Sequence, residues 1–288
     1  MDVLEPLRSN WQFLVFAVFL LGLCVGSFLN VVVHRLPRMM EAEWKADCAE
    51  FEGRELAPAE TYNLVTPRSR CPACAAPITA LQNIPVVSWL ALRGRCASCK
   101  VPISPRYPLV ELLTGAVSAF LAFAYGFTPA LLLALVYAWA LIAAAFIDYD
   151  TQLLPDRITL PLLWLGLIVN VPGLFVDLPS AVLGAAAGYL LLWSVYWGFK
   201  LLAGKEGMGF GDFKLLAAIG AWTGWQVIPL ALLVSATLGA VVGLIGMALA
   251  GKDREARIPF GPFLAVGGLA ALLWGRAAVV AWVGYFPR

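Results

Sequence analysis

A series of long apolar stretches constrains this chain more than any other feature. The 288 residues are 61% apolar and only 13% charged, whereas an ordinary soluble domain carries about 25% charged residues. About twenty apolar residues suffice to cross a bilayer as a helix. Eight segments are candidate spans, all of about this length or longer except 213–224: 11–33, 108–126, 129–147, 158–175, 180–202, 213–224, 226–250 and 259–285. The sequence therefore predicts an all-α polytopic integral membrane protein with about eight transmembrane helices.

Two other features of the chain exclude further classes. The net charge of +2 is too small to suggest a nucleic-acid partner. The N-terminus does not resemble a cleavable signal, because Asp2 and Glu5 stand where a basic region is expected. We therefore interpret the run from Trp11 to Val33 as a retained span.

Charge is concentrated between the first two predicted spans. Residues 34–107 contain ten of the twenty Lys and Arg and seven of the eighteen acids. Because basic loops remain in the cytoplasm, this segment is predicted to be a cytoplasmic domain inserted after the first transmembrane helix, residues 1–33. Residues 108–288 form the predicted helical membrane domain.

The orientation of the other loops follows from this cytoplasmic insert, because successive spans cross the membrane in alternating directions. The segments 148–157, 203–212 and 251–258 then also face the cytoplasm, and both termini face the opposite side. This parity requires the segment 213–224 to cross, although its twelve residues are short enough for a re-entrant or tilted half-helix.

Asp148 and Asp212 stand at the ends of apolar stretches, where charge is expensive. The orientation places both at cytoplasmic ends of spans and at similar depth. Two carboxyl groups that share one proton can hydrolyse a peptide bond: the ionised one takes a proton from water while the protonated one polarises the carbonyl. The pair therefore predicts an aspartyl protease.

Three other acidic residues each have more than one interpretation. Asp150 is close to the site but is also explained as a solvated residue. Asp156, after Pro155, suits the N-terminus of a helix, where the dipole favours a carboxylate. Glu111 pairs locally with Arg106 or faces substrate.

Asp212 follows a glycine-rich loop, Gly207 to Gly211. Glycines such as Gly209 and Gly211 permit unusual backbone angles and close approach, so this loop is a candidate edge for pairing with an extended peptide substrate. A flexible linker, with Asp212 capping the next helix, is the alternative.

Two Cys-x-x-Cys pairs lie in the polar insert, Cys71 with Cys74 and Cys96 with Cys99. Four thiolates arranged tetrahedrally make a closed structural zinc site, and the predicted cytoplasmic location argues against stable disulfides. The insert is therefore predicted to be a small zinc-binding domain with one structural zinc ion per chain. Redox pairs and disulfides are the competing interpretations.

Taken together, these motifs resemble the type IV prepilin peptidases, which are GxGD aspartyl proteases, along most of the chain. The resemblance rests on five ordered groups of residues: Gly26–Val32 with Arg35–Pro37, the paired cysteines, Arg106–Gly115, Asp148 with Leu154–Asp156, and Gly209–Lys214.

The resemblance implies a bifunctional enzyme of the bacterial inner membrane, with periplasmic termini and an active site facing the cytoplasm. It implies cleavage of the short basic leader of type IV prepilins or type II secretion pseudopilins after a glycine. It also implies S-adenosylmethionine-dependent N-methylation of the new N-terminus, with residues 34–107 as the expected location. The residues themselves identify no site for the methyl donor, because no Gly-x-Gly-x-x-Gly opens a βαβ unit.

Two alternative functions remain open at this stage. The chain is either an intramembrane GxGD protease with other substrates, or a transporter that uses Asp148 and Asp212 as a proton or cation site. The paired cysteines and the first-helix motif count against the first alternative, and the second leaves the cysteine domain unexplained.

Overall fold

The computed structural model describes residues 5–54, 61–204, 208–250 and 258–285, and within these ranges the regular elements are helices, with two isolated β-bridges. The chain divides into two compact units, Met1–Leu131 and Leu132–Arg288. Residues 108–288 were predicted to form one membrane domain. The structure instead joins the second predicted span to the first unit, because this helix packs along the first long helix.

The first unit contains the short helix α1 (Glu5–Ser9) and the long helix α2 (Trp11–Phe51). The side chain of Asn10 caps α2 by accepting hydrogen bonds from the backbone N–H groups of Gln12 and Phe13, at 3.0 and 3.1 Å. Free N–H groups in the first turn need such acceptors.

The first transmembrane helix was predicted to end at residue 33, whereas α2 continues to Phe51. The helix α2 has 41 residues, which corresponds to about 60 Å at 1.5 Å per residue, or roughly twice the bilayer core. The stretch 39–50 is rich in Met, Ala, Glu and Lys, which favour helix, and Lys45 pairs with Glu41 one turn earlier at 2.7 Å. The apolar run therefore ends at residue 33, but the helix continues beyond it.

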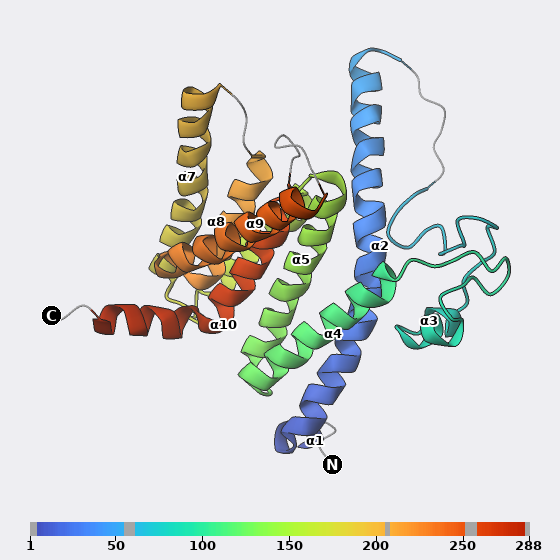
Figure 1. The fold of residues 1–288 in the computed structure, drawn as a ribbon. Coiled ribbons are helices and arrows are strands. Elements are labelled where there is room, and N and C mark those ends of the chain that lie inside the picture. The colour runs from blue at the N-terminus through green and yellow to red at the C-terminus, as the bar shows by residue number, and fades with distance from the viewer. Residues whose placement is uncertain (1–4, 55–60, 205–207, 251–257, 286–288) are drawn as a thin grey trace. The chain divides into compact units, whose positions relative to one another are not determined.

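The helix α4 (Arg106–Tyr125) packs against α2 through small residues. A Cβ atom on Gly22 would lie 2.6 Å from the Ser118 hydroxyl, and one on Gly26 would lie 2.7 Å from the Glu111 Cα. Small residues four apart let membrane helices approach closely. Between α2 and α4 lie the 3-10 helix η1 (Leu81–Asn83), the short helix α3 (Val87–Ala91) and the paired cysteines (Figure 1).

Gly26→Ala is expected to destabilise the first unit, because the added methyl group would meet backbone that cannot rotate away. Overpacking of this kind costs about 1–3 kcal/mol, measurable as a lower unfolding temperature in detergent. Gly198→Ala is the matched control, since a Cβ there meets nothing within 4 Å. An unchanged unfolding temperature for Gly26→Ala would contradict the close α2–α4 contact.

The second unit begins within α5 (Pro129–Thr151) and continues through α6 (Asp156–Val169), α7 (Leu178–Ala203), α8 (Phe210–Thr223), the 3-10 helix η2 (Trp225–Val227), α9 (Ile228–Ala250) and α10 (Gly261–Tyr285). The helix α8 packs against α6, α7 and α10 (Figure 1). Every residue of α8 from Leu215 to Thr223 is buried. A helix that is apolar on all sides belongs in the interior of a bundle.

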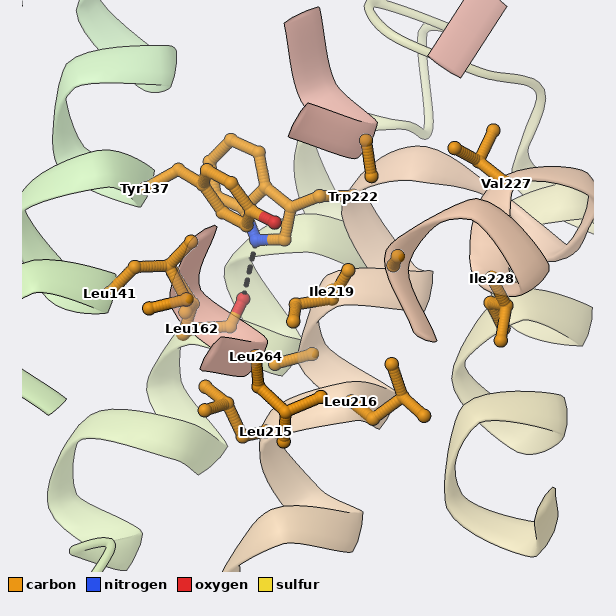
Figure 2. Packing of buried hydrophobic residues seen from close by; sticks show 14 of the residues in the cluster. Tyr137, Leu141, Leu162, Leu215, Leu216, Ile219, Trp222, Val227, Ile228 and Leu264 are labelled. Atoms are coloured by element: carbon orange, nitrogen blue, oxygen red, sulfur yellow. Dashed lines mark hydrogen bonds between the residues drawn. The ribbon is translucent and has the colours of Figure 1, made fainter. Parts of the chain in front are cut away.

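Trp222 of α8 lies at the centre of this core. Its indole N–H donates a hydrogen bond of 2.8 Å to the carbonyl oxygen of Leu162 on α6, and its ring contacts Tyr137 with centroids 4.9 Å apart (Figure 2). Asn170, after α6, donates to the carbonyl of Ala221 at 2.9 Å. These polar contacts fix the C-terminal end of α8 in an otherwise apolar core.

Six described helices are long and apolar enough to cross a membrane: α2, α4, α5, α7, α10 and the segment Trp225–Leu249 that contains most of α9. The other two predicted spans, 158–175 and 213–224, correspond to α6 and α8, which have 14 residues each. At 1.5 Å per residue each covers about 21 Å, which is shorter than the bilayer core. The fold is therefore an all-α membrane protein with six candidate spans.

Candidate active site and metal-binding cysteines

Asp148 lies in the last turn of α5 and is buried, with 5% of its surface exposed. Its Oδ2 atom accepts a hydrogen bond of 2.8 Å from the backbone N–H of Gly261, the first residue of α10. A buried carboxyl group needs such a donor, because desolvation is otherwise costly. The end of α5 and the start of α10 are thus tied together through this side chain.

Asp212 is the third residue of α8 and is also buried, with 7% of its surface exposed. Its carboxyl group accepts a hydrogen bond from the backbone of Gly209, the N-cap of α8. A third-position carboxyl that reaches back to the cap satisfies a donor that the helix itself leaves free. The Asp148 carboxyl group acts electrostatically on Asp212, so the two buried carboxyl groups of the second unit interact with each other.

The glycines before Asp212 shape the start of α8. Gly211 lies within the first turn of α8, and a Cβ on it would come 2.6 Å from the Leu154 Cβ. This close approach brings the start of α8 against the connection between α5 and α6. Gly209 is the N-cap, in an extended conformation, and Gly207 lies outside the described residues.

Lys214, one turn into α8, reaches Asp156 at the start of α6. Its Nζ atom lies 2.7 and 2.8 Å from the two carboxylate oxygens of Asp156. Both side chains are partly exposed, so the ion pair contributes little to stability. It does fix the start of α8, and with it Asp212, relative to α6.

The remaining acidic candidates, Asp150 and Glu111, are not buried with Asp148 and Asp212 in the second unit. Asp150 is exposed at the end of α5. Glu111 belongs to the first unit, where it is buried on α4 and accepts a hydrogen bond of 2.7 Å from the backbone N–H of Val86. Val86 has a positive φ of 61°, so Glu111 holds a strained turn of the segment between the two cysteine pairs. This role was not apparent from the sequence.

Gly261 is the contact residue of Asp148 that the sequence analysis missed. Its contribution is a backbone N–H, which a sequence pattern does not report. The available signal was a glycine followed by proline at the start of an apolar run, within Pro259–Pro262, which is typical of a helix N-terminus.

The four cysteines come together in the first unit. The sulfur atoms of Cys71, Cys74, Cys96 and Cys99 all lie within 4.8 Å of one another, with Cys71 and Cys99 3.7 Å apart. Tetrahedral zinc with bonds of about 2.3 Å places its sulfur ligands about 3.8 Å apart. The cluster is therefore able to hold a metal ion of this kind.

The two cysteine pairs form matching turns. Cys71 and Cys96 each accept a backbone hydrogen bond from the residue four positions later, Ala75 and Lys100, and both of these have positive φ, 57° and 61°. Backbone N–H groups of Cys99 and Ser98 lower the pKa of the Cys96 thiol to about 6.

Cys71 sits in an equivalent setting. Its pKa is also lowered, by the backbone N–H groups of Cys74 and Ala73. Each turn therefore favours the thiolate of its first cysteine, which is the form that binds metal, whereas burial and the neighbouring cysteine side chains raise the pKa of Cys99 to about 11.

These features define a polytopic helical membrane protein with a buried pair of carboxyl groups in one unit and a four-cysteine cluster in the other. Two family models match the chain along the same division. The bacterial peptidase A24 N-terminal domain matches residues 20–125, and the type IV leader peptidase family matches residues 135–244.

Curated relatives match over nearly the whole length. The chain is 55% identical to the prepilin leader peptidase/N-methyltransferase of Pseudomonas aeruginosa over 96% of this chain and 95% of that protein. It is 54% identical to the protein of that name from Aeromonas hydrophila, over 96% of each, and 52% identical to the one from Burkholderia pseudomallei, over 91% of this chain and 85% of that protein. No solved structure matches the chain. The chain belongs to the type IV leader peptidase family, which confirms the resemblance inferred from its motifs.

Proposed function

We propose that this protein removes the leader of type IV prepilins, or of type II secretion pseudopilins, and methylates the N-terminus that the cleavage exposes. The observation that carries the peptidase is the burial of Asp148 and Asp212 in the second unit, where the two carboxyl groups interact and each accepts a hydrogen bond from a backbone N–H. The membership of the family, and the names of relatives that share more than half of the sequence, support both activities.

The proposed cleavage needs one carboxylate and one carboxylic acid. The carboxylate takes a proton from a water molecule as the water oxygen attacks the scissile carbonyl carbon, and the acid protonates the carbonyl oxygen. The resulting diol then collapses: the carbon–nitrogen bond breaks, the amine leaves with the proton held by the first group, and the diol proton returns to the second. Two neighbouring carboxyl groups suit this chemistry because both do not ionise together.

The proposed substrate carries a basic leader in the cytoplasm and an apolar helix in the membrane. Residues 34–107 and both aspartates are accordingly assigned to the cytoplasmic side of the bacterial inner membrane, with periplasmic termini, on the distribution of Lys and Arg. The acids on the polar end of α2 and its cap are exposed and complement a basic leader: Glu41, Glu43, Asp47, Glu50 and Glu52.

The four cysteines are proposed to hold one structural zinc ion, as their spacing and thiolate-favouring turns support. The site is closed by four protein ligands, which is typical of zinc that stabilises a fold rather than activates water. Methylation is assigned to the first unit, which contains the matched N-terminal domain. S-adenosylmethionine would supply an electrophilic methyl group, and no described residue is assigned to bind it.

The proposal is tested by incubating the purified protein with a prepilin and S-adenosylmethionine and weighing the products by mass spectrometry. We expect a leader fragment that ends in glycine and a mature chain heavier by one methyl group. An intact prepilin after prolonged incubation would contradict the peptidase. A mature chain of unmodified mass would contradict only the methylation.

A further inference from the structure

Few backbone N–H groups at the start of α10 are available to an acceptor outside the helix, and Asp148 accepts a hydrogen bond from the Gly261 N–H. Pro262 has no N–H, and the N–H groups of Phe263 and Leu264 both donate to the Phe260 carbonyl at 3.1 Å. The N–H of Gly261 donates to Asp148 Oδ2 at 2.8 Å. Asp148, a residue of α5, is therefore the side-chain cap of α10.

The contact between Gly261 and Asp148 leaves no room for a side chain. Gly261 is buried, and a Cβ on it would lie 2.7 Å from Asp148 Oδ2 and 3.0 Å from both Cβ and Cγ of that residue. Real Cβ atoms are essentially never found closer than 3.0 Å to such neighbours. Any other L-residue at 261 would displace the carboxyl group.

The two aspartates thus have unequal partners. Asp212 reaches back to the N-cap of its own helix, whereas Asp148 is bonded to the N-terminus of a different helix, 25 residues long. The N-terminal end of a helix carries partial positive charge and favours a carboxylate over a neutral acid, and this holds for Asp212 in the first turn of α8 as well. The bond fixes Oδ2, so the orientation of the Asp148 carboxyl group depends on Gly261.

We propose that Gly261 is a positioning residue for leader cleavage: its N–H holds the Asp148 carboxyl group in the orientation in which it exchanges protons with water and the substrate. This inference rests on the proposed peptidase function. In the cleavage step one of the two aspartates, as the carboxylate, takes a proton from water as the water oxygen bonds to the carbonyl carbon. The other, as the acid, protonates the carbonyl oxygen. The first proton then leaves with the amine, and the second aspartate is reprotonated as the diol collapses.

The first test is Gly261→Ala, assayed for prepilin cleavage. A misplacement of about 1 Å costs roughly a hundredfold in rate, so kcat is expected to fall about a hundredfold with KM within about twofold of wild type. Gly275→Ala is the matched control: it lies on the same helix, is buried, and its added Cβ would meet the Val227 side chain, far along α10 from Asp148. This control is expected to retain kcat.

A second test does not depend on the folding of Gly261→Ala. Asparagine at 148 keeps an oxygen that accepts from Gly261, whereas alanine removes the cap. Asp148→Asn is expected to unfold at the wild-type temperature and Asp148→Ala about 2–4 °C lower. Equal unfolding temperatures for the two variants would overturn the capping contact.

The outcomes separate this inference from the proposed function. A wild-type protein that does not cleave prepilin refutes the peptidase. A wild-type protein that cleaves, with Asp148→Asn inactive and Gly261→Ala at full kcat, refutes the role of Gly261 alone. A fall in kcat for Gly275→Ala equal to that for Gly261→Ala also overturns it, because crowding anywhere on α10 would then suffice.

Discussion

Asp148→Asn and Asp212→Asn are each expected to lower the rate of leader cleavage about a thousandfold or more. Each substitution keeps the shape of the side chain but removes a group that must accept or donate a proton, and proton transfer by a positioned side chain is worth about 10²–10⁴-fold. Both carboxyl groups are buried and interact with each other, so neither is readily replaced by a neighbour. The measurement is the initial rate of prepilin shortening by the purified variants.

Asp177→Asn is the control for this experiment. Asp177 is another carboxylate at a helix N-terminus of the same unit, where it accepts from the Ser180 N–H at 3.0 Å as the N-cap of α7. Asparagine caps helices as well as aspartate does, so cleavage by Asp177→Asn is expected within about twofold of wild type. Substantial cleavage by either Asp148→Asn or Asp212→Asn would refute the aspartyl pair.

Replacing Cys71 and Cys74 together with serine is expected to remove the metal ion and unfold the segment between α2 and α4. Four sulfur atoms within 4.8 Å of one another converge from loops that contain few helical residues. In small domains of this kind, structural zinc supplies about 10–16 kcal/mol of apparent binding free energy. The wild-type protein should carry about one zinc per chain by elemental analysis, and the double variant less than about a tenth of that.

Cys24 and Cys48 provide the matched comparison, since both are exposed and lie outside the cluster. Their replacement by serine should leave the zinc content and the protease resistance of residues 61–105 unchanged. A folded, metal-free wild-type protein would contradict the zinc site. Retention of zinc by the Cys71/Cys74 double variant would contradict the assignment of the ligands.

Hydropathy predicted the helical membrane fold because apolar runs in lipid have few alternatives to helix. It overestimated the number of long spans for a physical reason: α8 is apolar because it is buried within the second unit, and a buried helix is as apolar as one that faces lipid. Conversely, α2 continues beyond its apolar run because helix propensity persists when hydrophobicity ends.

The carboxyl pair and the cysteines were accessible from the sequence because unusual residue types mark them. The contacts that position them were not. Gly261 acts through its backbone N–H and its missing side chain, and Glu111 acts on the backbone of a residue 25 positions away. Neither interaction leaves a residue pattern, so both required the packed structure.

The most direct test of the central claim is an experimental structure with a peptide mimic of the tetrahedral diol bound. The aspartyl mechanism predicts that the carboxyl groups of Asp148 and Asp212 both lie within hydrogen-bond distance of the diol oxygens, about 2.6–3.2 Å, with Asp148 still bonded to the Gly261 N–H. A mimic bound by only one of the two carboxyl groups, or by neither, would contradict it.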